Sequence, residues 1–132
     1  MTSDLELQLL HYSASSSKIL MLSLLFDVSD HPNAFIDSLN LNDLLGNNAE
    51  SKEYPKNLNL NDLFNGSLES MFKENYHVRY EGSLTYSPCT EGVTWILVLE
   101  KFKNLSSLQV EDLRMLVRNK NTARQIQPFN GR

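Results

Sequence analysis

Residues 80–95 read Tyr-Glu-Gly-Ser-Leu-Thr-Tyr-Ser-Pro-Cys-Thr-Glu-Gly-Val-Thr-Trp and lead into the most strand-like segment of the chain. Residues 93–99 are β-branched, aromatic or aliphatic, and they are bounded by Gly92 and by the charged pair Glu100-Lys101, which is typical of a buried strand. Proline, glycine and hydroxyl residues just before this segment are turn-forming. The pattern predicts a loop entering a core strand, and it leaves open whether that loop positions a ligand.

Three other segments outside this stretch also have strand patterns. They are residues 76–80, which alternate, residues 18–28, which are almost continuously apolar, and residues 5–12, which alternate at first. A nearly continuous apolar run is typical of a strand buried on both faces. The sequence therefore predicts at least four strands.

The alternation in residues 5–12 assigns side chains to two faces. Successive side chains of a strand point to opposite faces. Glu6, Gln8 and Leu10 should therefore share one face. Leu5, Leu7, Leu9 and His11 should share the other.

Two segments are predicted to be helical. Residues 34–45 carry spaced apolar side chains, and Pro32 is placed to occupy the first helical position. Ser106 and Gln109 have the spacing of a capping box. The residues after that box form an apolar stripe that predicts packing against a core. The stripe consists of Val110, Leu113, Leu116 and Val117.

Composition limits the classes of partner. The 132 residues suit one domain, with 41% hydrophobic and 21% charged residues, as in a soluble globular protein. The net charge of −4 gives no reason to expect nucleic acid. The longest apolar run, residues 19–26, is too short to span a bilayer. We therefore expect neither a nucleic-acid nor a membrane partner, and nothing in the sequence indicates a compartment.

The stretch from residue 80 to residue 95 closely resembles the signature segment of α-class carbonic anhydrases. Residues 105–110 resemble the late helix of that family, and residues 127–132 resemble its tail, in the same order along the chain. The resemblance implies a mainly β (α+β) fold, with a twisted, mostly antiparallel sheet and peripheral helices. It covers only about the C-terminal half of a family domain, so residues 1–132 are expected to form a truncated domain.

The resemblance also implies a zinc chemistry whose ligands can be sought in this sequence. Family members hydrate carbon dioxide with a zinc-bound hydroxide held by three histidines. Two of these form a His-x-His pair, which this sequence lacks. The third lies in a motif like Glu-x-His-x-x-His-Trp, which here reads Glu-Leu-Gln-Leu-Leu-His-Tyr over residues 6–12.

This alignment places Gln8 at the third zinc-ligand position and Glu6 at the carboxylate that orients the missing histidine. An amide oxygen is a poor substitute for imidazole at zinc. His11 aligns with a later histidine that is not a ligand, and we interpret it as structural. We therefore expect no metal ligand and no zinc cofactor in this chain.

Other family positions are retained, and the resemblance gives each a role. Thr85 aligns with the threonine that orients the zinc-bound hydroxide. Tyr86 replaces a small residue and is expected to crowd the carbon dioxide pocket. Cys89 aligns with a disulfide cysteine of secreted members, whose partner is absent here; it is either free or bonded to another chain, and we expect it to be free and buried. The positions that match the pocket are Leu10, Ile19, Met21, Leu84, Val93 and Trp95.

Three functional hypotheses follow. The first is a carbonic-anhydrase-like pseudoenzyme, without zinc or carbon dioxide hydration, that acts as a binding or assembly module. The second is one half of a zinc enzyme that interconverts carbon dioxide and bicarbonate, with a second segment supplying the His-x-His pair. The third is a non-functional truncated product. A half-sheet should expose a strand edge and a core face, so either another chain completes the sheet, which is the partner we expect, or the isolated chain is only marginally stable.

Overall fold

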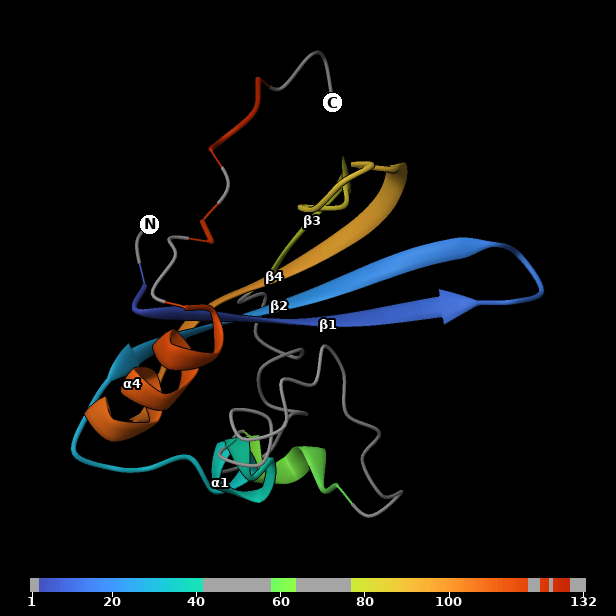
Figure 1. Cartoon of the computed structure of the whole chain (residues 1–132). Helices are drawn as coiled ribbons and strands as arrows, with labels where there is room; N and C mark the ends of the chain where they lie inside the picture. Colours follow the sequence, from blue (N-terminus) through green and yellow to red (C-terminus); the bar gives the residue numbers. More distant parts are fainter. Residues whose placement is uncertain (1–2, 42–57, 64–76, 119–121, 124, 129–132) are drawn as a thin grey trace.

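The computed structural model describes residues 3–41, 58–63, 77–118, 122–123 and 125–128. These residues form one four-stranded sheet with helices packed on it (Figure 1). The strands are β1 (Leu5–Ser13), β2 (Lys18–Val28), β3 (His77–Ser83) and β4 (Glu91–Leu105). The helices are α1 (Ala34–Ser38), the 3-10 helix η1 (Leu60–Leu63) and α4 (Ser107–Leu116).

The strand order in the sheet is β1-β2-β4-β3. The outer pairs, β1 with β2 and β3 with β4, are antiparallel. The central pair, β2 with β4, is parallel. The predicted mainly β (α+β) class is confirmed, and the sheet itself is mixed.

The four predicted strands are all present, and two of them extend several residues beyond their predicted ends. β3 continues to Ser83, and β4 runs to Leu105, past the charged pair that was expected to end it. The charge at Lys101 is accommodated because its Nζ atom lies 2.9 Å from Asp27 Oδ1 on the neighbouring strand. The extension matters because Phe102 and Leu105 belong to the main core.

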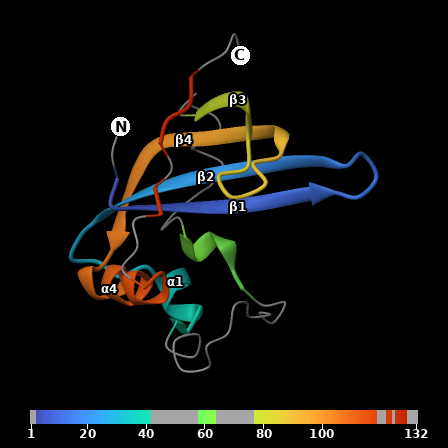
Figure 2. The same ribbon diagram turned by 45° about the horizontal axis from the view of Figure 1, so that its top comes forward.

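The main core lies between the sheet and the helices, which are all on one side of it (Figure 2). Leu5, Leu7 and Leu9 pack against this core, so the predicted apolar face of β1 is confirmed. The middle of β2 is buried, while its two ends, Lys18 and Val28, are exposed. The buried side chains of the core are Leu24, Phe26, Phe35, Ile36, Leu41, Leu63, Val98, Phe102, Leu105 and Val110.

The structure corrects the predicted helix over residues 34–45. Helix α1 ends at Ser38, and residues 42–45 lie outside the described residues. The residue that caps its N-terminus is Asn33, whose side chain accepts hydrogen bonds from the backbone N–H groups of Phe35 and Ile36. Pro32 therefore precedes the cap and is not the first helical residue. Asparagine is favoured at the N-cap position because its side-chain oxygen accepts hydrogen bonds from helix N–H groups that would otherwise be unpaired.

The predicted capping box of α4 is confirmed, with Ser106 and Gln109 bonded reciprocally. The apolar stripe ends earlier than expected, since Val117 is exposed and follows the helix. Gln109 also reaches α1. Its Oε1 atom accepts the Asn33 N–H at 3.0 Å, and its Nε2 atom donates to Asn33 O at 2.9 Å and to Asp37 Oδ1. We call this set of bonds the Gln109 clamp, because it fixes α1 to α4 beneath the sheet.

No helix in the described part of the chain is both long and apolar enough to pass through a membrane.

Candidate functional site

The face of the sheet turned away from α1 and α4 carries the polar residues of β1, and we call it the site face. The strand register shows which of its side chains lie next to one another across the strands. Gln8 lies opposite Ser23, and Leu10 lies opposite Met21. Met21 in turn pairs with Trp95, and Trp95 pairs with Tyr80. Paired residues share a face, so the side chains of four strands meet here.

Four side chains on this face form a hydrogen-bonded chain, which we call the polar row. Ser23 Oγ donates to Glu6 Oε1 at 2.7 Å. Gln8 Nε2 donates to the same oxygen at 3.1 Å. Thr85 Oγ1 donates to Gln8 Oε1 at 3.2 Å. The row thus links two neighbouring strands to the segment that follows β3.

The segment after β3 reaches β1 because it crosses over the sheet, as the yellow trace in Figure 2 shows. Trp95 Nε1 donates to the carbonyl oxygen of Ser83 at 3.0 Å, and Leu84 is buried against the sheet. Gly82 makes this close approach possible. A Cβ atom there would lie 3.0 Å from Trp95 Cδ1, which is too short for an ordinary contact. The glycine of the signature stretch therefore helps to position Thr85.

The residues around Gln8 do not fit a zinc site. Both ends of its amide are already hydrogen-bonded, to Glu6 and to Thr85. His11 belongs to the opposite face by alternation, and its Nδ1 atom lies 3.1 Å from Leu9 O. Within the described ranges, no three His, Cys, Asp or Glu side chains are grouped as metal ligands would be.

Most of the predicted pocket residues gather in a second, smaller core on the site face. This cluster consists of Met21, Leu84, Val93 and Trp95, with Ile19 packed against it. Leu10 does not join the cluster, and its side chain is 46% exposed. Leu10 lies on β1, which is an edge strand. In the described structure β1 has a neighbouring strand on one side only, so Leu10 has neighbours on that side only.

The loop after Thr85 differs from expectation at two residues. Tyr86 is 55% exposed, so it does not crowd the cluster. The Cys89 N–H donates to Tyr86 O at 2.8 Å, which closes a turn. Cys89 itself is free but only half-buried, since it lies in this surface turn and not in either core.

Sequence reasoning missed two residues of the site. Ser23 joins the polar row, and the only signal was that it interrupts an apolar strand. Tyr80 stacks on Trp95, with ring centroids 6.0 Å apart and planes inclined by 8°. Burial raises the pKa of the Tyr80 phenol, and the negative charge of Glu6 raises it further. Tyr80 is therefore electrostatically linked to the polar row.

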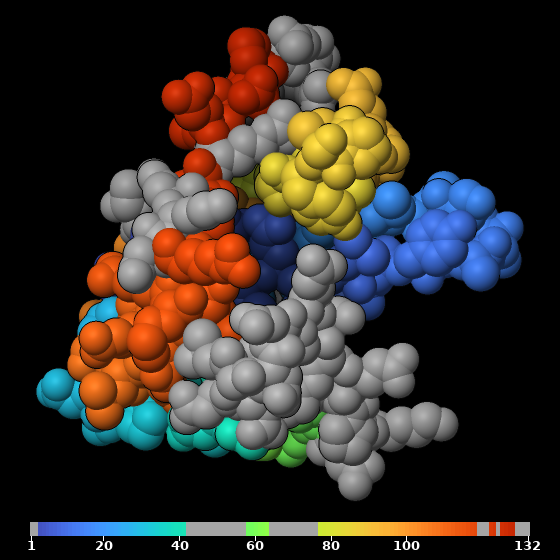
Figure 3. Space-filling view, viewed as in Figure 1, coloured from blue at the N-terminus to red at the C-terminus, as the bar shows by residue number. Residues whose placement is uncertain are grey.

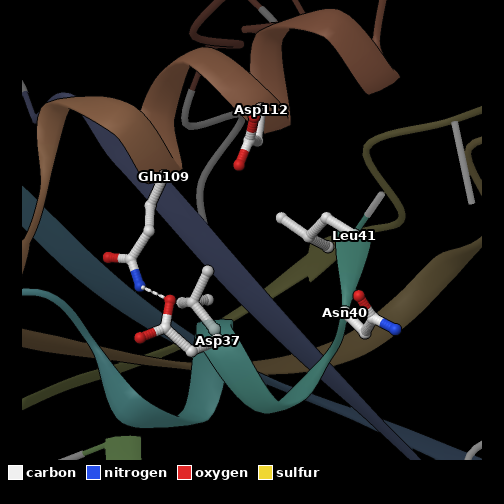
Figure 4. Close-up of a pocket in the computed structure, with 6 residues that line it drawn as sticks. Asp37, Asn40, Leu41, Gln109 and Asp112 are labelled. Carbon is white, nitrogen blue, oxygen red and sulfur yellow. Dashed lines mark hydrogen bonds between the residues drawn. The ribbon is translucent and has the colours of Figure 1, made fainter. Parts of the chain in front are cut away.

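A small cavity of about 110 Å³ lies away from this site, between α1 and α4 (Figure 4). Asp37 and Asp112 line it from the two helices, and the Gln109 amide donates to Asp37 at its margin. The clamp accounts for Gln109 and Asp37 as parts of the helix junction. We therefore place the candidate site on the opposite face, at the polar row.

The sheet topology, the signature loop and the retained threonine together define an α-carbonic-anhydrase fold. The family model for eukaryotic-type carbonic anhydrase matches residues 2–132. The chain belongs to this family.

Individual relatives agree with this assignment. The chain is 42% identical over 67 residues to a carbonic anhydrase of Nesocodon mauritianus, an alignment covering 49% of this chain and 24% of the relative. It is 57% identical over 37 residues to the carbonic anhydrase-related protein of Homo sapiens, and this alignment covers 28% of this chain and 12% of that relative. The α-carbonic anhydrase structure of Photobacterium profundum superimposes with a TM-score of 0.67 and 25% identity, covering 95% of this chain and 52% of that one. The chain thus spans about half the length of this solved relative.

Proposed function

We propose that this chain is a carbonic-anhydrase-fold protein that holds no catalytic zinc on its own residues, does not hydrate carbon dioxide, and uses the site face for binding or assembly. The observation that carries the proposal is Gln8. It stands where the resemblance places the third zinc ligand, and its amide is hydrogen-bonded to Glu6 and Thr85. A position that is a metal ligand in the enzymes is here an internal link of the protein.

The chemistry of the amide supports this reading. Zinc sites of this class use neutral imidazole nitrogens, and an amide oxygen is a much weaker ligand. To reach a metal, the Gln8 oxygen would also have to give up the hydrogen bond from Thr85. Gln8 lies inside the described sheet, so its weak ligand group and its bond from Thr85 would oppose zinc binding even if another segment supplied a His-x-His pair.

We further propose that the partner is a chain that completes the sheet. In the four-strand order, β1 and β3 are the edges. Figure 3 shows the tip of the β1–β2 hairpin projecting from the rest of the molecule. Tyr12, near that tip, is 62% exposed, and Leu10 is 46% exposed on the same strand face. An edge strand with exposed apolar side chains is suited to pairing with a further strand.

The test is to measure bound zinc and carbon dioxide hydration on one sample, after zinc loading and dialysis. A carbonic anhydrase with all three histidines, treated in parallel, is the positive control. We expect substoichiometric zinc and no hydration above the buffer rate. Stoichiometric zinc with a hydration rate that a chelator abolishes would contradict the proposal.

One observation favours the second candidate, a half-enzyme completed by another chain. The Thr85 hydroxyl donates to Gln8, the residue that the resemblance places at the ligand position. Under this alternative, a complex of this chain with a partner carrying the His-x-His pair would bind zinc and hydrate carbon dioxide. A native complex that is zinc-free and inactive would leave the binding module as the better account.

A further inference from the structure

The two edges of the sheet, β1 and β3, differ in how they are protected against pairing (Figure 2). β3 carries the charged residues Arg79 and Glu81, and its register with β4 shifts between Gly82 and Ser83. Charged side chains and bulges are features that keep edge strands from pairing with other chains. β1 contains no lysine, arginine or proline, and it pairs with β2 along its whole length without a register shift. β1 is therefore the edge that is open to a further strand.

The site face of β1 carries an unused hydrogen-bond acceptor near one end and an unused donor near the other. The Oε1 atom of Glu6 accepts from both Ser23 and Gln8, while its Oε2 atom accepts from no described residue. The Tyr12 side chain is 62% exposed, and its hydroxyl bonds to no described residue. A strand rises about 3.4 Å per residue, so the positions of Glu6 and Tyr12 on β1 are roughly 20 Å apart. These two groups can therefore meet only between two chains.

Antiparallel pairing of two β1 strands about a twofold axis at Leu9 brings the acceptor and the donor together. In a twofold contact the same patch of both copies meets, and an axis perpendicular to the sheet keeps the site faces on one side. Leu5 then lies opposite Ser13 of the second copy, so all nine residues of β1 are paired. Glu6 lies opposite Tyr12 of the second copy. Side chains opposed in this way have Cβ atoms about 4.5–5.5 Å apart, so the phenol can donate to the carboxylate.

The neighbouring registers are less favourable for Glu6. A shift by one residue would join a site face to a core face, so the nearest alternatives shift by two. One of them places Glu6 opposite Leu10 of the second copy, an apolar side chain, and the other places it opposite Ala14, beyond the end of β1. The register centred on Leu9 also keeps the two Glu6 carboxylates roughly 20 Å apart, well beyond the screening length of about 8 Å. The carbonyl oxygen of Leu9, which lies 3.1 Å from His11 Nδ1, can accept a second hydrogen bond.

We propose that this chain forms a homodimer by antiparallel β1–β1 pairing, in which Tyr12 of each copy donates a hydrogen bond to Glu6 of the other. The pairing joins two four-stranded sheets into one continuous sheet. Assembly stops at the dimer, because the twofold contact uses the β1 edge of both copies. This inference rests on the proposed completion of the sheet by another chain, and it identifies that chain as a second copy.

The first test is sedimentation equilibrium of the unmodified chain over a range of concentrations. Reductant prevents Cys89, which is free, from linking two copies, and a chelator removes any metal that could bridge them. We expect a monomer–dimer equilibrium without larger species. A chain that stays monomeric at its highest soluble concentration, or that forms an open-ended series of oligomers, overturns the inference.

Tyr12→Phe and Tyr86→Phe form a matched pair of variants for the hydrogen bond between the copies. Tyr12→Phe should weaken dimerisation about tenfold, because each dimer loses two hydrogen bonds to a carboxylate. Tyr86 is also exposed, at 55%, but it lies outside β1, so Tyr86→Phe should leave dimerisation unchanged. Equal dimerisation in Tyr12→Phe and the unmodified chain would overturn the proposed contact.

Disulfide trapping in a Cys89→Ala background tests the register, since Cys89 is the single cysteine of the chain. In the proposed dimer, Leu9 faces its own copy with Cα atoms about 4.5–5.5 Å apart, a separation that a disulfide can span. Leu7 lies opposite His11 of the second copy and roughly 14 Å from the second Leu7. Oxidation should therefore link Leu9→Cys into covalent dimers on a non-reducing gel and leave Leu7→Cys unlinked. Equal linking of the two variants overturns the register, and circular dichroism reports whether both are folded.

The outcomes separate this inference from the proposed function. A monomeric chain that binds no zinc would overturn the homodimer and leave the proposed absence of zinc catalysis standing, with a different chain completing the sheet. Stoichiometric zinc with carbon dioxide hydration would overturn the proposed function whatever the oligomeric state.

Discussion

Two glutamine side chains in this molecule have both ends of the amide hydrogen-bonded, yet their surroundings differ. Gln109 is 6% exposed. Its bonds to Asn33 and Asp37 join α1 to α4, and it also accepts the Ser106 N–H within the cap of its own helix. Gln8 is half-buried on the site face and makes one bond at each end, to Glu6 and Thr85. The amide of Gln109 thus lies in a buried helix junction, whereas the amide of Gln8 lies on an accessible surface.

The difference shows what a glutamine contributes in each setting. Where water is excluded, removing the amide leaves its partners unpaired, and each such group costs free energy. Where water has access, the partners can bond to solvent instead, so the amide is nearly dispensable for folding. A solvent-accessible glutamine can therefore be replaced at little cost in stability, so binding can determine which residue stands at that position. This is why we assign Gln109 to stability and Gln8 to function.

The largest expected effect is that of Gln109→Leu. The substitution keeps a similar side-chain size but leaves the Asn33 N–H, the Asn33 carbonyl and the Ser106 N–H without their partner. With Asn33 fully buried, we expect the free energy of unfolding to fall by about 3 kcal/mol. Urea denaturation followed by circular dichroism measures this loss.

The control for this variant is Glu111→Gln, an exposed change on the same helix, which should alter the free energy of unfolding by less than about 0.5 kcal/mol. A loss below about 1 kcal/mol in Gln109→Leu would mean that solvent replaces the clamp, and the contrast between the two glutamines would then disappear.

A smaller effect is expected for Gln8→Leu. This change removes the link between Glu6 and Thr85, but Glu6 is exposed and can be hydrated. We expect the free energy of unfolding to fall by about 1 kcal/mol or less, in the same urea assay. A loss as large as that of Gln109→Leu would show that the polar row is part of the folding core, and would weaken its assignment to binding.

The fold was predictable where local pattern and tertiary packing agree. The alternation in residues 5–12 separated the core face of β1 from its site face, and the structure confirms this division. The end of β4 was not predictable from pattern. Its charged residues read as a strand boundary, but the strand continues because Phe102 and Leu105 pair with β2 and pack into the core, and Lys101 is paired with Asp27, 74 residues away.

The site was predictable only through residues with a recognisable motif. The signature stretch led to Thr85 and Leu84, and the separate motif over residues 6–12 led to Gln8. Ser23 carries no motif, and its bond to Glu6 depends on the β1–β2 register, which no single segment encodes. Likewise, the exposure of Tyr86 was not predictable, because the residue lies in a turn closed by the bond from the Cys89 N–H to its carbonyl oxygen.

The smallest expected effect is a dependence of stability on alkaline pH through Tyr80. Burial, and to a lesser extent the charge of Glu6, raise the pKa of its phenol above the ordinary value of 10.0. The folded chain therefore holds this proton more tightly than the unfolded chain. The resulting stability is fully present below pH 10.0 and is lost as pH rises through the folded pKa.

The free energy of unfolding should accordingly fall more steeply above pH 10.0 in the unmodified chain than in Tyr80→Phe, which has no proton to lose. Phenolate absorbance, taken as the difference between these two proteins, measures the folded pKa directly. Glu6→Gln should lower that pKa only part of the way, because burial is the larger cause. If Glu6→Gln left the pKa of Tyr80 unchanged, the phenol and the polar row would be electrostatically independent. The site face would then lack the coupling that sets it apart from the Gln109 clamp.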